Sequence, residues 1–217
     1  MRASRLWHAG VAAVVAFALV LQLVLVIAFP ADDSPGSAAV RVLRFFSFFT
    51  VQSNILVLVA AVSLVQSPRR DGPLWRVVRL DAVLAIAVTG VVHYQVLRPI
   101  QDLGGWDAVA DILLHVVSPI IAVMGWLVFG PRPRISWTDV ARSAVWPVAW
   151  LAYTLLHGAI SEWYPYPFID VTEIGYGRTL INAAIVTVIF LVLATACRWL
   201  DRTLRPAPSP PGSTAGD

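Results

Sequence analysis

The sequence predicts an all-α, polytopic membrane protein with six transmembrane helices and both termini in the cytoplasm. Hydrophobic residues make up 58% of the 217 residues and charged residues only 13%, and the mean hydropathy is +0.74. This leaves too little polar material to cover a soluble domain. Six apolar segments occur, most of them near the roughly 20 residues that a spanning helix needs. The distribution of arginine then orients the helices.

The expected spans follow one another with short connections, at residues 9–29, 45–66, 80–97, 108–129, 140–160 and 179–198. The first is about 21 residues long, which exceeds the roughly 7 to 15 apolar residues of a signal peptide, so we expect an uncleaved helix. The third begins beside Asp81 and the fifth beside Asp139, where an acid suits the start of a helix. We expect one domain, 1–205, followed by a disordered tail, 206–217, rich in Pro, Ser and Gly.

Arginine collects on alternate connections. One side of the predicted bundle holds Arg2, Arg5, Arg69, Arg70, Arg76, Arg79, Arg132, Arg134, Arg142, Arg198, Arg202 and Arg205. The other side holds only Arg41, Arg44, Arg98 and Arg178, together with several acids. Short cytoplasmic loops collect positive charge, so both termini are expected in the cytoplasm. Because the arginines stand at membrane boundaries without interleaved aromatic residues, the net charge of +3 does not indicate a nucleic-acid partner.

Composition also bears on source and cofactors. Every basic residue is arginine, and Ala and Val dominate the helices, a bias typical of high-GC bacterial genomes, so we expect a bacterial inner membrane. The single cysteine, Cys197, excludes an internal disulfide. The chain has no CxxC, P-loop or GxGxxG motif, so no cofactor and no metal is expected from motifs.

Polar residues inside the spans fall at similar depths. At 1.5 Å of rise per residue, Thr50 lies about 9 Å and His115 about 12 Å below the outer face, and His93 and His157 lie about 8 Å below it. Polar side chains are costly in hydrocarbon unless they face a partner or a cavity. A shared layer on four helices therefore predicts a cavity that opens toward the outer leaflet.

Neighbouring residues strengthen this prediction. Asp111 precedes His115 by four residues and lies on the same helix face, within reach of its imidazole. Arg178 and Asn182 have the same spacing near the same surface. Pro119 follows His115 by four residues and removes a hydrogen bond to its carbonyl, which favours a kink.

Two chemistries fit these residues. In the first, Thr50 is a nucleophile, His115 its base and Asp111 the group that orients the imidazole, with Gln52, Asn54 or Asn182 holding an oxyanion. In the second, paired histidines bind a haem iron or another metal, as in an electron carrier. A non-catalytic lipid-binding or transport protein is a third possibility. In the plainest reading, Thr50 bonds the carbonyl of Phe46 and the histidines join helices by hydrogen bonds.

Three stretches resemble the family of androgen-induced and androgen-dependent transmembrane proteins, in particular its bacterial branch. They are FFSFFTVQSNILVLV (45–59), DILLHVVSPIIAVMGW (111–126) and LLHGAISEWYPYPFIDVTEIGYG (155–177). The His-x3-Pro pattern and the run WYPYPF (163–168) are the most specific parts. The resemblance covers about residues 10–200 of the chain.

This resemblance implies a six-helix membrane hydrolase that cleaves fatty-acid esters of hydroxy fatty acids with a threonine nucleophile and a histidine. In the stretches that match the family's motifs, the threonine and the histidine correspond to Thr50 and His115. The expected partner is thus a membrane lipid or lipid ester, with no cofactor. Animal members tend to have two adjacent histidines where this chain has only His157. The run WYPYPF is expected to form a stiff outer loop over the entrance to the cavity.

Overall fold

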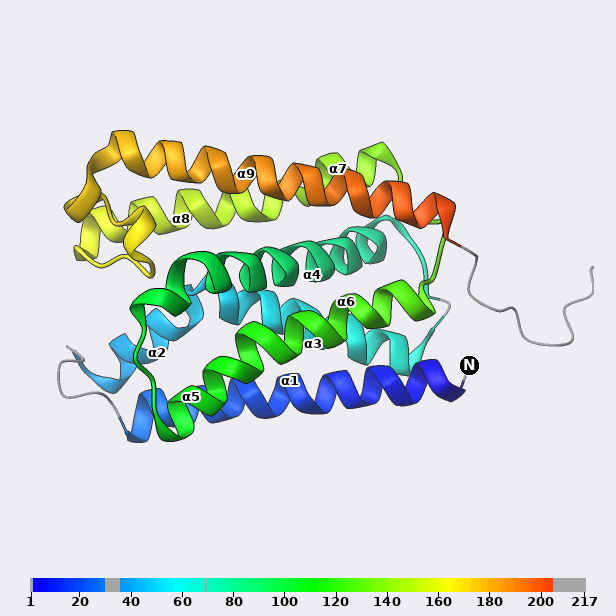
Figure 1. The fold of residues 1–217 in the computed structure, drawn as a ribbon, viewed down its shortest axis with the longest axis horizontal. Helices are drawn as coiled ribbons and strands as arrows, with labels where there is room; N and C mark the ends of the chain where they lie inside the picture. Colours follow the sequence, from blue (N-terminus) through cyan, green and yellow to red (C-terminus); the bar gives the residue numbers. More distant parts are fainter. Residues whose placement is uncertain (1, 30–35, 69, 205–217) are drawn as a thin grey trace, which may run out of the picture.

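Six helices are long and apolar enough to cross a membrane, which confirms the predicted all-α, multi-pass class (Figure 1). The computed structural model describes residues 2–29, 36–68 and 70–204, so the predicted tail, 206–217, lies outside the described residues. The spans are Arg2–Ala28, Phe49–Gln66, Pro73–Ile100, Gly105–Phe129, Trp137–Ser161 and Val171–Thr203. Each of them overlaps one predicted segment.

Within the described residues, some spans are divided into several elements. In chain order these are α1 (Arg2–Ala28), α2 (Ala38–Ser47), α3 (Phe49–Gln66), α4 (Pro73–Val92), the π-helical turn η1 (His93–Leu97), the 3-10 turn η2 (Arg98–Ile100), α5 (Gly105–Ile112), the π-helical turn η3 (Leu113–Val117), α6 (Ser118–Phe129), α7 (Trp137–Ser143), α8 (Val145–Ser161), the 3-10 turn η4 (Pro167–Ile169) and α9 (Val171–Thr203).

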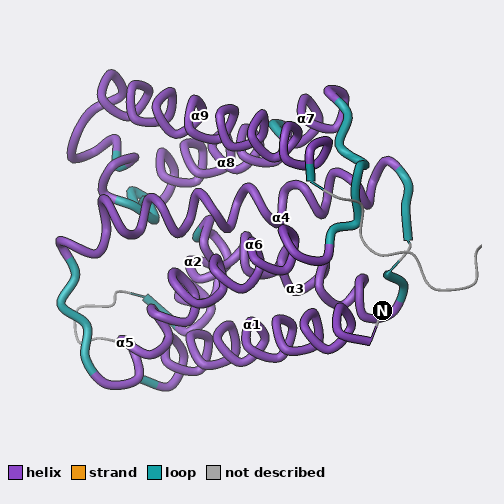
Figure 2. Tube along the Cα trace, turned by 45° about the vertical axis from the view of Figure 1, so that its right-hand side comes forward, coloured by secondary structure: helices purple, strands orange, loops and turns teal. Residues whose placement is uncertain are grey.

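Helix α4 lies at the centre of the bundle. Figures 1 and 2 show it between a layer of α8 and α9 and a layer that contains α1, α3 and α6. Ala82 and Ile86 of α4 pack in a core cluster with residues of α1 and α3. Leu84 and Val88 pack in a second cluster with residues of α9. Helix α4 therefore buries two faces, and its middle part, residues 82–88, is entirely apolar.

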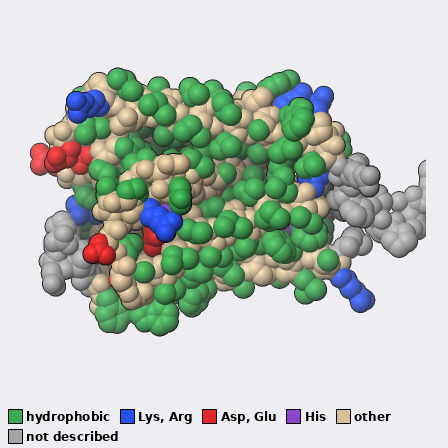
Figure 3. Space-filling view, viewed as in Figure 1, with side chains coloured by type: hydrophobic (Ala, Val, Ile, Leu, Met, Phe, Trp, Pro, Cys, Tyr) green, Lys and Arg blue, Asp and Glu red, His purple; other side chains and the backbone are tan. Residues whose placement is uncertain are grey.

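Large apolar side chains cover the outside of the bundle between its two ends. Figure 3 shows this belt in green, with charged side chains mainly toward the ends. Its members include the exposed residues Phe17, Val20, Ile120, Leu156 and Val188. An exposed apolar surface of this extent suits hydrocarbon and not water.

The first span begins and the last span ends at the same end of the bundle, which we call the terminal end (Figure 1). The loop between α8 and α9 lies at the other end, which we call the opposite end. The arginine pattern predicts that the terminal end faces the cytoplasm.

The predicted second span, 45–66, is wrong at its start, because the helix is interrupted at Phe48. That residue has extended backbone angles (φ −67°, ψ 130°) between α2 and α3. The indole N–H of Trp150 on α8 donates to the carbonyl of Ser47 at 3.0 Å. The Phe48 ring packs edge-on against Trp163 and Tyr166. These contacts hold the chain in an extended turn, where periodicity alone predicts a continuous helix.

The predicted third span, 80–97, is also wrong at its start. Helix α4 begins at Pro73, a favourable residue for the first turn of a helix. Arg76 and Arg79 therefore belong to the helix, and Asp81 is buried in its interior and not at its start. The expectation for Asp139 is confirmed, because Asp139 and Ser136 form a capping box at the start of α7.

The loop between α8 and α9 packs directly on Gly158 of α8. A β-carbon at position 158 would lie 2.1 Å from Cε1 of Tyr164, so Gly158→Ala must displace that ring. We expect this variant to lower the free energy of unfolding by about 1–3 kcal/mol, as overpacking usually does. Thermal or denaturant unfolding in detergent measures the change.

Gly177→Ala is the matched control. Gly177 lies in α9, and a β-carbon there would have no atom within 4 Å. This variant should keep or slightly raise the stability, because alanine favours a helix over glycine. Equal stability of the two variants would contradict the packing of Tyr164 on α8.

Candidate active site

Thr50 lies in the first turn of α3, directly after the interruption at Phe48. Its Oγ1 is 3.1 Å from Nε2 of His115 and 3.2 Å from the hydroxyl of Tyr166. The side chain is buried. The threonine therefore bonds other helices and loops, and the carbonyl of Phe46 accepts the amide of Gln52 instead, at 2.9 Å.

His115 lies in the π-helical turn η3, with Asp111 four residues before it on α5. Nδ1 of His115 is 2.8 Å from a carboxylate oxygen of Asp111, as the four-residue spacing predicts. Nδ1 also forms a hydrogen bond with the main-chain carbonyl of Asp111 at 3.1 Å. A neutral imidazole with its proton on Nδ1 has a free lone pair on Nε2. That lone pair faces Oγ1 of Thr50.

His93 completes this group from the neighbouring α4–η1 span. Its ring stacks on His115 with the centroids 4.2 Å apart, and its Nε2 is 3.4 Å from the second carboxylate oxygen of Asp111. His93 is almost fully buried. One carboxylate thus holds two imidazoles, which fixes the orientation of His115 from two directions.

Two features of the helices make this meeting possible. The α4 and α6 spans each contain a π-helical turn, at His93–Leu97 and Leu113–Val117, and such turns are frequent at functional sites. Pro119 accounts for the second turn, because it removes a hydrogen bond within the helix, as predicted. Gly90 lets α4 approach closely, since a β-carbon there would be 3.2 Å from Pro119.

Tyr166 is a site residue that the sequence did not single out. Its hydroxyl accepts a hydrogen bond from the backbone N–H of Thr50 at 3.1 Å. The first N–H groups of a helix need such acceptors, and the N-cap residue Phe48 has no polar side chain to provide one. Burial raises the pKa of the Tyr166 phenol above its ordinary value, so the group remains a hydrogen-bond donor. The sequence run WYPYPF predicted the loop itself. A loop has no regular periodicity, so the sequence did not indicate which of its two tyrosines points into the bundle.

A pocket with about 890 Å³ of space begins at Thr50 and Tyr166. It runs between α3, α4, α8 and α9, and it is lined mainly by apolar side chains, among them Val88, Trp150 and Phe190. An apolar lining with a polar end suits an apolar small molecule with one polar group at the Thr50 end.

The predicted amide groups form hydrogen bonds to the backbone. Asn54 donates to the carbonyls of Thr50 and Leu114, at 2.9 Å and 3.2 Å, and so ties α3 to the turn that carries His115. Asn182 donates to the carbonyl of Phe168 at 2.8 Å. Gln52 donates to the carbonyl of Phe46, so all three amides bond the backbone in this structure. The sequence alone had suggested that they could act as oxyanion donors.

Two other predicted residues lie apart from the group around Thr50. His157 stacks on Tyr153 and contacts the edge of Trp163. Arg178 is exposed on α9. The structure thus brings together Thr50, His93, Asp111 and His115 from the predicted layer, and it does not bring His157 into this set.

The group also has the composition of a metal site. His93, Asp111 and His115 offer ligand atoms that all lie within 4.8 Å of one another, and two imidazoles with one carboxylate suit a catalytic zinc. A bis-histidine haem does not fit this pair. Axial imidazoles approach the iron from opposite faces of the porphyrin, whereas these rings are stacked face to face at 4.2 Å.

No protein-family model, no curated protein and no solved structure matches this chain.

Proposed function

We propose that this chain is an integral membrane hydrolase that cleaves carboxylic esters of lipids, with Thr50 as nucleophile and His115 as base. The observation that carries the proposal is the order Thr50–His115–Asp111: Nε2 of His115 is 3.1 Å from Oγ1 of Thr50, and Nδ1 is 2.8 Å from a carboxylate oxygen of Asp111 and 3.1 Å from its main-chain carbonyl. Hydrolases that act through a hydroxyl use the same order of nucleophile, base and orienting acid.

The hydrogen bonds have one consistent direction. The Nδ1–H of His115 donates to Asp111, the hydroxyl of Thr50 donates to Nε2 of His115, and the hydroxyl of Tyr166 donates to Oγ1 of Thr50. When Thr50 attacks, Nε2 takes its proton, and the carboxylate of Asp111 stabilises the imidazolium that forms.

Attack on the ester carbonyl forms a tetrahedral intermediate with a negative oxygen. The hydroxyl of Tyr166, which is 3.2 Å from Oγ1 of Thr50, would donate to this oxygen after the attack, and the N-terminus of α3 adds a positive field at the same point. Collapse breaks the bond to the leaving oxygen, which receives the proton from His115 and departs as an alcohol. Water, activated by His115, then cleaves the acyl-threonine, releasing the carboxylic acid and restoring Thr50.

The pocket and the sequence resemblance support the choice of substrate. An apolar pocket with Thr50 in its lining suits an acyl chain whose carbonyl lies beside Thr50. The resemblance to the androgen-induced transmembrane family favours fatty-acid esters of hydroxy fatty acids. In a bacterial inner membrane with a cytoplasmic terminal end, the site faces the outer leaflet.

Replacing the nucleophile gives the first test. We expect Thr50→Ala to lose labelling by a fluorophosphonate probe and to lose hydrolysis of a fatty-acid ester, because the change removes the proposed attacking hydroxyl. Thr50→Ser should keep measurable activity, since it retains the hydroxyl. Gel fluorescence after labelling and product analysis by mass spectrometry provide the readouts.

Thr195→Ala is the matched control, because Thr195 is exposed on α9 and bonds only the carbonyl of Leu191 among the described residues. It should be labelled like the parent chain. A parent chain that is not labelled, or a Thr50→Ala variant labelled equally, would contradict the proposal and favour a non-catalytic lipid-binding protein.

Tyr166→Phe tests the oxyanion donor. We expect kcat to fall by about 10²- to 10³-fold, as on removal of one such donor, with a smaller change in KM. Because burial raises the pKa of this phenol, it stays protonated from about pH 7 to about pH 9, below the ordinary tyrosine value of about 10. The ratio of parent to variant kcat should therefore stay constant over that range.

Tyr164→Phe serves as the control for Tyr166→Phe, since Tyr164 is buried in the same loop against Gly158. It should keep kcat within a few fold of the parent, an estimate that assumes only small packing changes. A ratio for Tyr166→Phe that approaches one as the pH rises would show that the phenol ionises in this range.

A metal-dependent hydrolase is the second candidate, favoured by the cluster of His93, Asp111 and His115. In that case the metal would activate a water molecule for attack on the ester. The three side chains would hold the ion, and Thr50 would orient the substrate.

Metal removal separates the two candidates. Under the threonine mechanism, treatment with a strong chelator should leave hydrolysis unchanged, and elemental analysis of the active protein should find less than one metal ion per chain. Loss of activity on chelation, with recovery on adding zinc, would assign the site to the metal-dependent reaction.

A further inference from the structure

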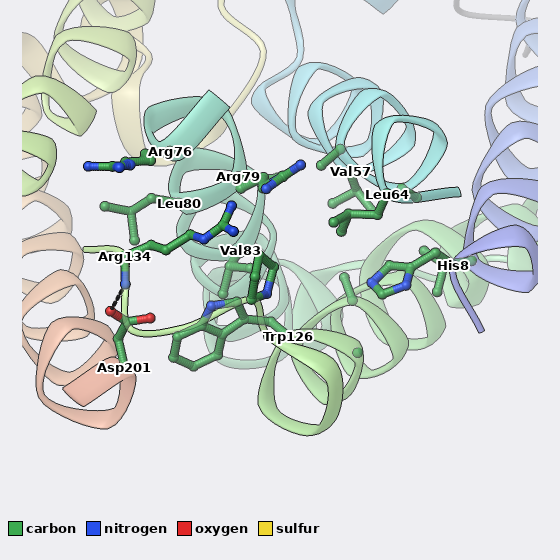
Figure 4. Close-up of a pocket in the computed structure, with 18 of the residues that line it drawn as sticks. His8, Val57, Leu64, Arg76, Arg79, Leu80, Val83, Trp126, Arg134 and Asp201 are labelled. Atoms are coloured by element: carbon green, nitrogen blue, oxygen red, sulfur yellow. Dashed lines mark hydrogen bonds between the residues drawn. The ribbon is translucent and has the colours of Figure 1, made fainter. Parts of the chain in front are cut away.

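A second pocket lies at the terminal end of the bundle, remote from Thr50. It contains about 730 Å³ of space between α1, α3, α4, α6, the connection after α6, and the end of α9. Most of its lining is apolar, with Val57, Leu64, Val83 and Trp126 among the residues in Figure 4. The charged residues in the lining are Arg76, Arg79, Arg134 and Asp201.

Two of these arginines have a counter-charge close by. Asp71 bonds Arg76 through both carboxylate oxygens at 2.8 Å and lies 3.5 Å from Arg134, and these guanidinium groups hold the pKa of Asp71 well below its usual range. Asp201 accepts the backbone N–H groups of Arg134 and Ile135, at 2.6 Å and 2.8 Å. Asp71 is thus engaged through both oxygens, whereas Asp201 is engaged through Oδ2 only, and its buried Oδ1 has no hydrogen-bond partner among the described residues.

Arg79 differs from the other two. Its Nη1 donates to the carbonyl of Arg70 at 2.8 Å, but its Nε and Nη2 are buried and have no hydrogen-bond partner among the residues that the structure describes. Arg134 and Arg70 add positive charge nearby, and Asp71 adds one negative charge. Burying charged donors without an acceptor is costly, so this position favours an anion.

The position of Arg79 indicates which anion. It lies in the second turn of α4, near the end of a membrane span, which is the depth of lipid headgroups. An arginine presents parallel donors that match two oxygens of a phosphate. Next to it, the apolar lining offers a surface for hydrocarbon.

We propose that this pocket binds the phosphate group of an anionic membrane lipid, with Arg79 as the main donor and the apolar lining in contact with the lipid chain. Inorganic phosphate has the same charged oxygens and is the other source of this chemistry. The apolar lining favours the lipid.

The test uses the full chain reconstituted in nanodiscs. We expect phosphatidylglycerol in a phosphatidylcholine background to be retained in native mass spectra and to raise the melting temperature relative to phosphatidylcholine alone. Inorganic phosphate should give no comparable rise. An equal rise with inorganic phosphate assigns the site to the free anion, and no rise with either ligand overturns the proposal.

Two variants address the charge and the apolar lining separately. Arg79→Gln should weaken phosphatidylglycerol binding by about 10- to 100-fold, the loss expected for charged hydrogen bonds. Ala122→Phe, which fills the apolar part without changing a charge, should also weaken it. The control Arg142→Gln removes an exposed arginine of α7 and should bind like the parent.

Each outcome decides the proposal. Parent-like binding by Arg79→Gln overturns it, and so does an equal loss in Arg142→Gln, which would indicate only a general effect of charge. If Arg79→Gln does not fold, Ala122→Phe still decides, because parent-like binding by that variant also overturns the proposal. Binding is measured without turnover, so the result is independent of Thr50.

Discussion

The interruption of the second span at Phe48 is the constraint on which the site depends. In hydrocarbon, a broken helix leaves carbonyl and N–H groups that water cannot satisfy. Here Trp150 donates to the carbonyl of Ser47, and Tyr166 accepts the N–H of Thr50. Side chains from α8 and from the loop after it thus replace the lost helix bonds, and they place Thr50 in the first turn of α3.

The cluster around His115 shows how polar groups are accommodated in the same layer. The carboxylate of Asp111 contacts two imidazoles at once, and Asn54 donates to the carbonyl of Leu114 in the π-helical turn. Each of these groups would be costly alone, but together they form a connected network. The network is rigid because its members belong to α3, α4 and the α5–α6 span, which all pack against one another.

Much of this arrangement was predictable from the sequence. Long apolar segments predict the spans, and the spacing of Asp111 and His115 predicts their contact, because both follow from regular helix geometry. The interruption at Phe48, the start of α4 at Pro73 and the inward position of Tyr166 were not predictable. They depend on contacts between residues far apart in the chain, such as Trp150 with Ser47, which no local pattern encodes. For the same reason the amides of Gln52, Asn54 and Asn182 looked available for an oxyanion, although backbone carbonyls occupy them.

Helix α4 also determines how the two pockets relate to each other. It contributes Val88 and Thr89 to the pocket at Thr50, and Arg79 and Leu80 to the pocket at the terminal end. Between them, residues 84–86 are almost completely buried, so a packed helix turn separates the two spaces. The two pockets have no lining residue in common. Helices α3 and α9 also line both pockets, so energetic coupling between the pockets would act through shifts of α3, α4 or α9, because packed cores transmit strain through discrete shifts of whole elements.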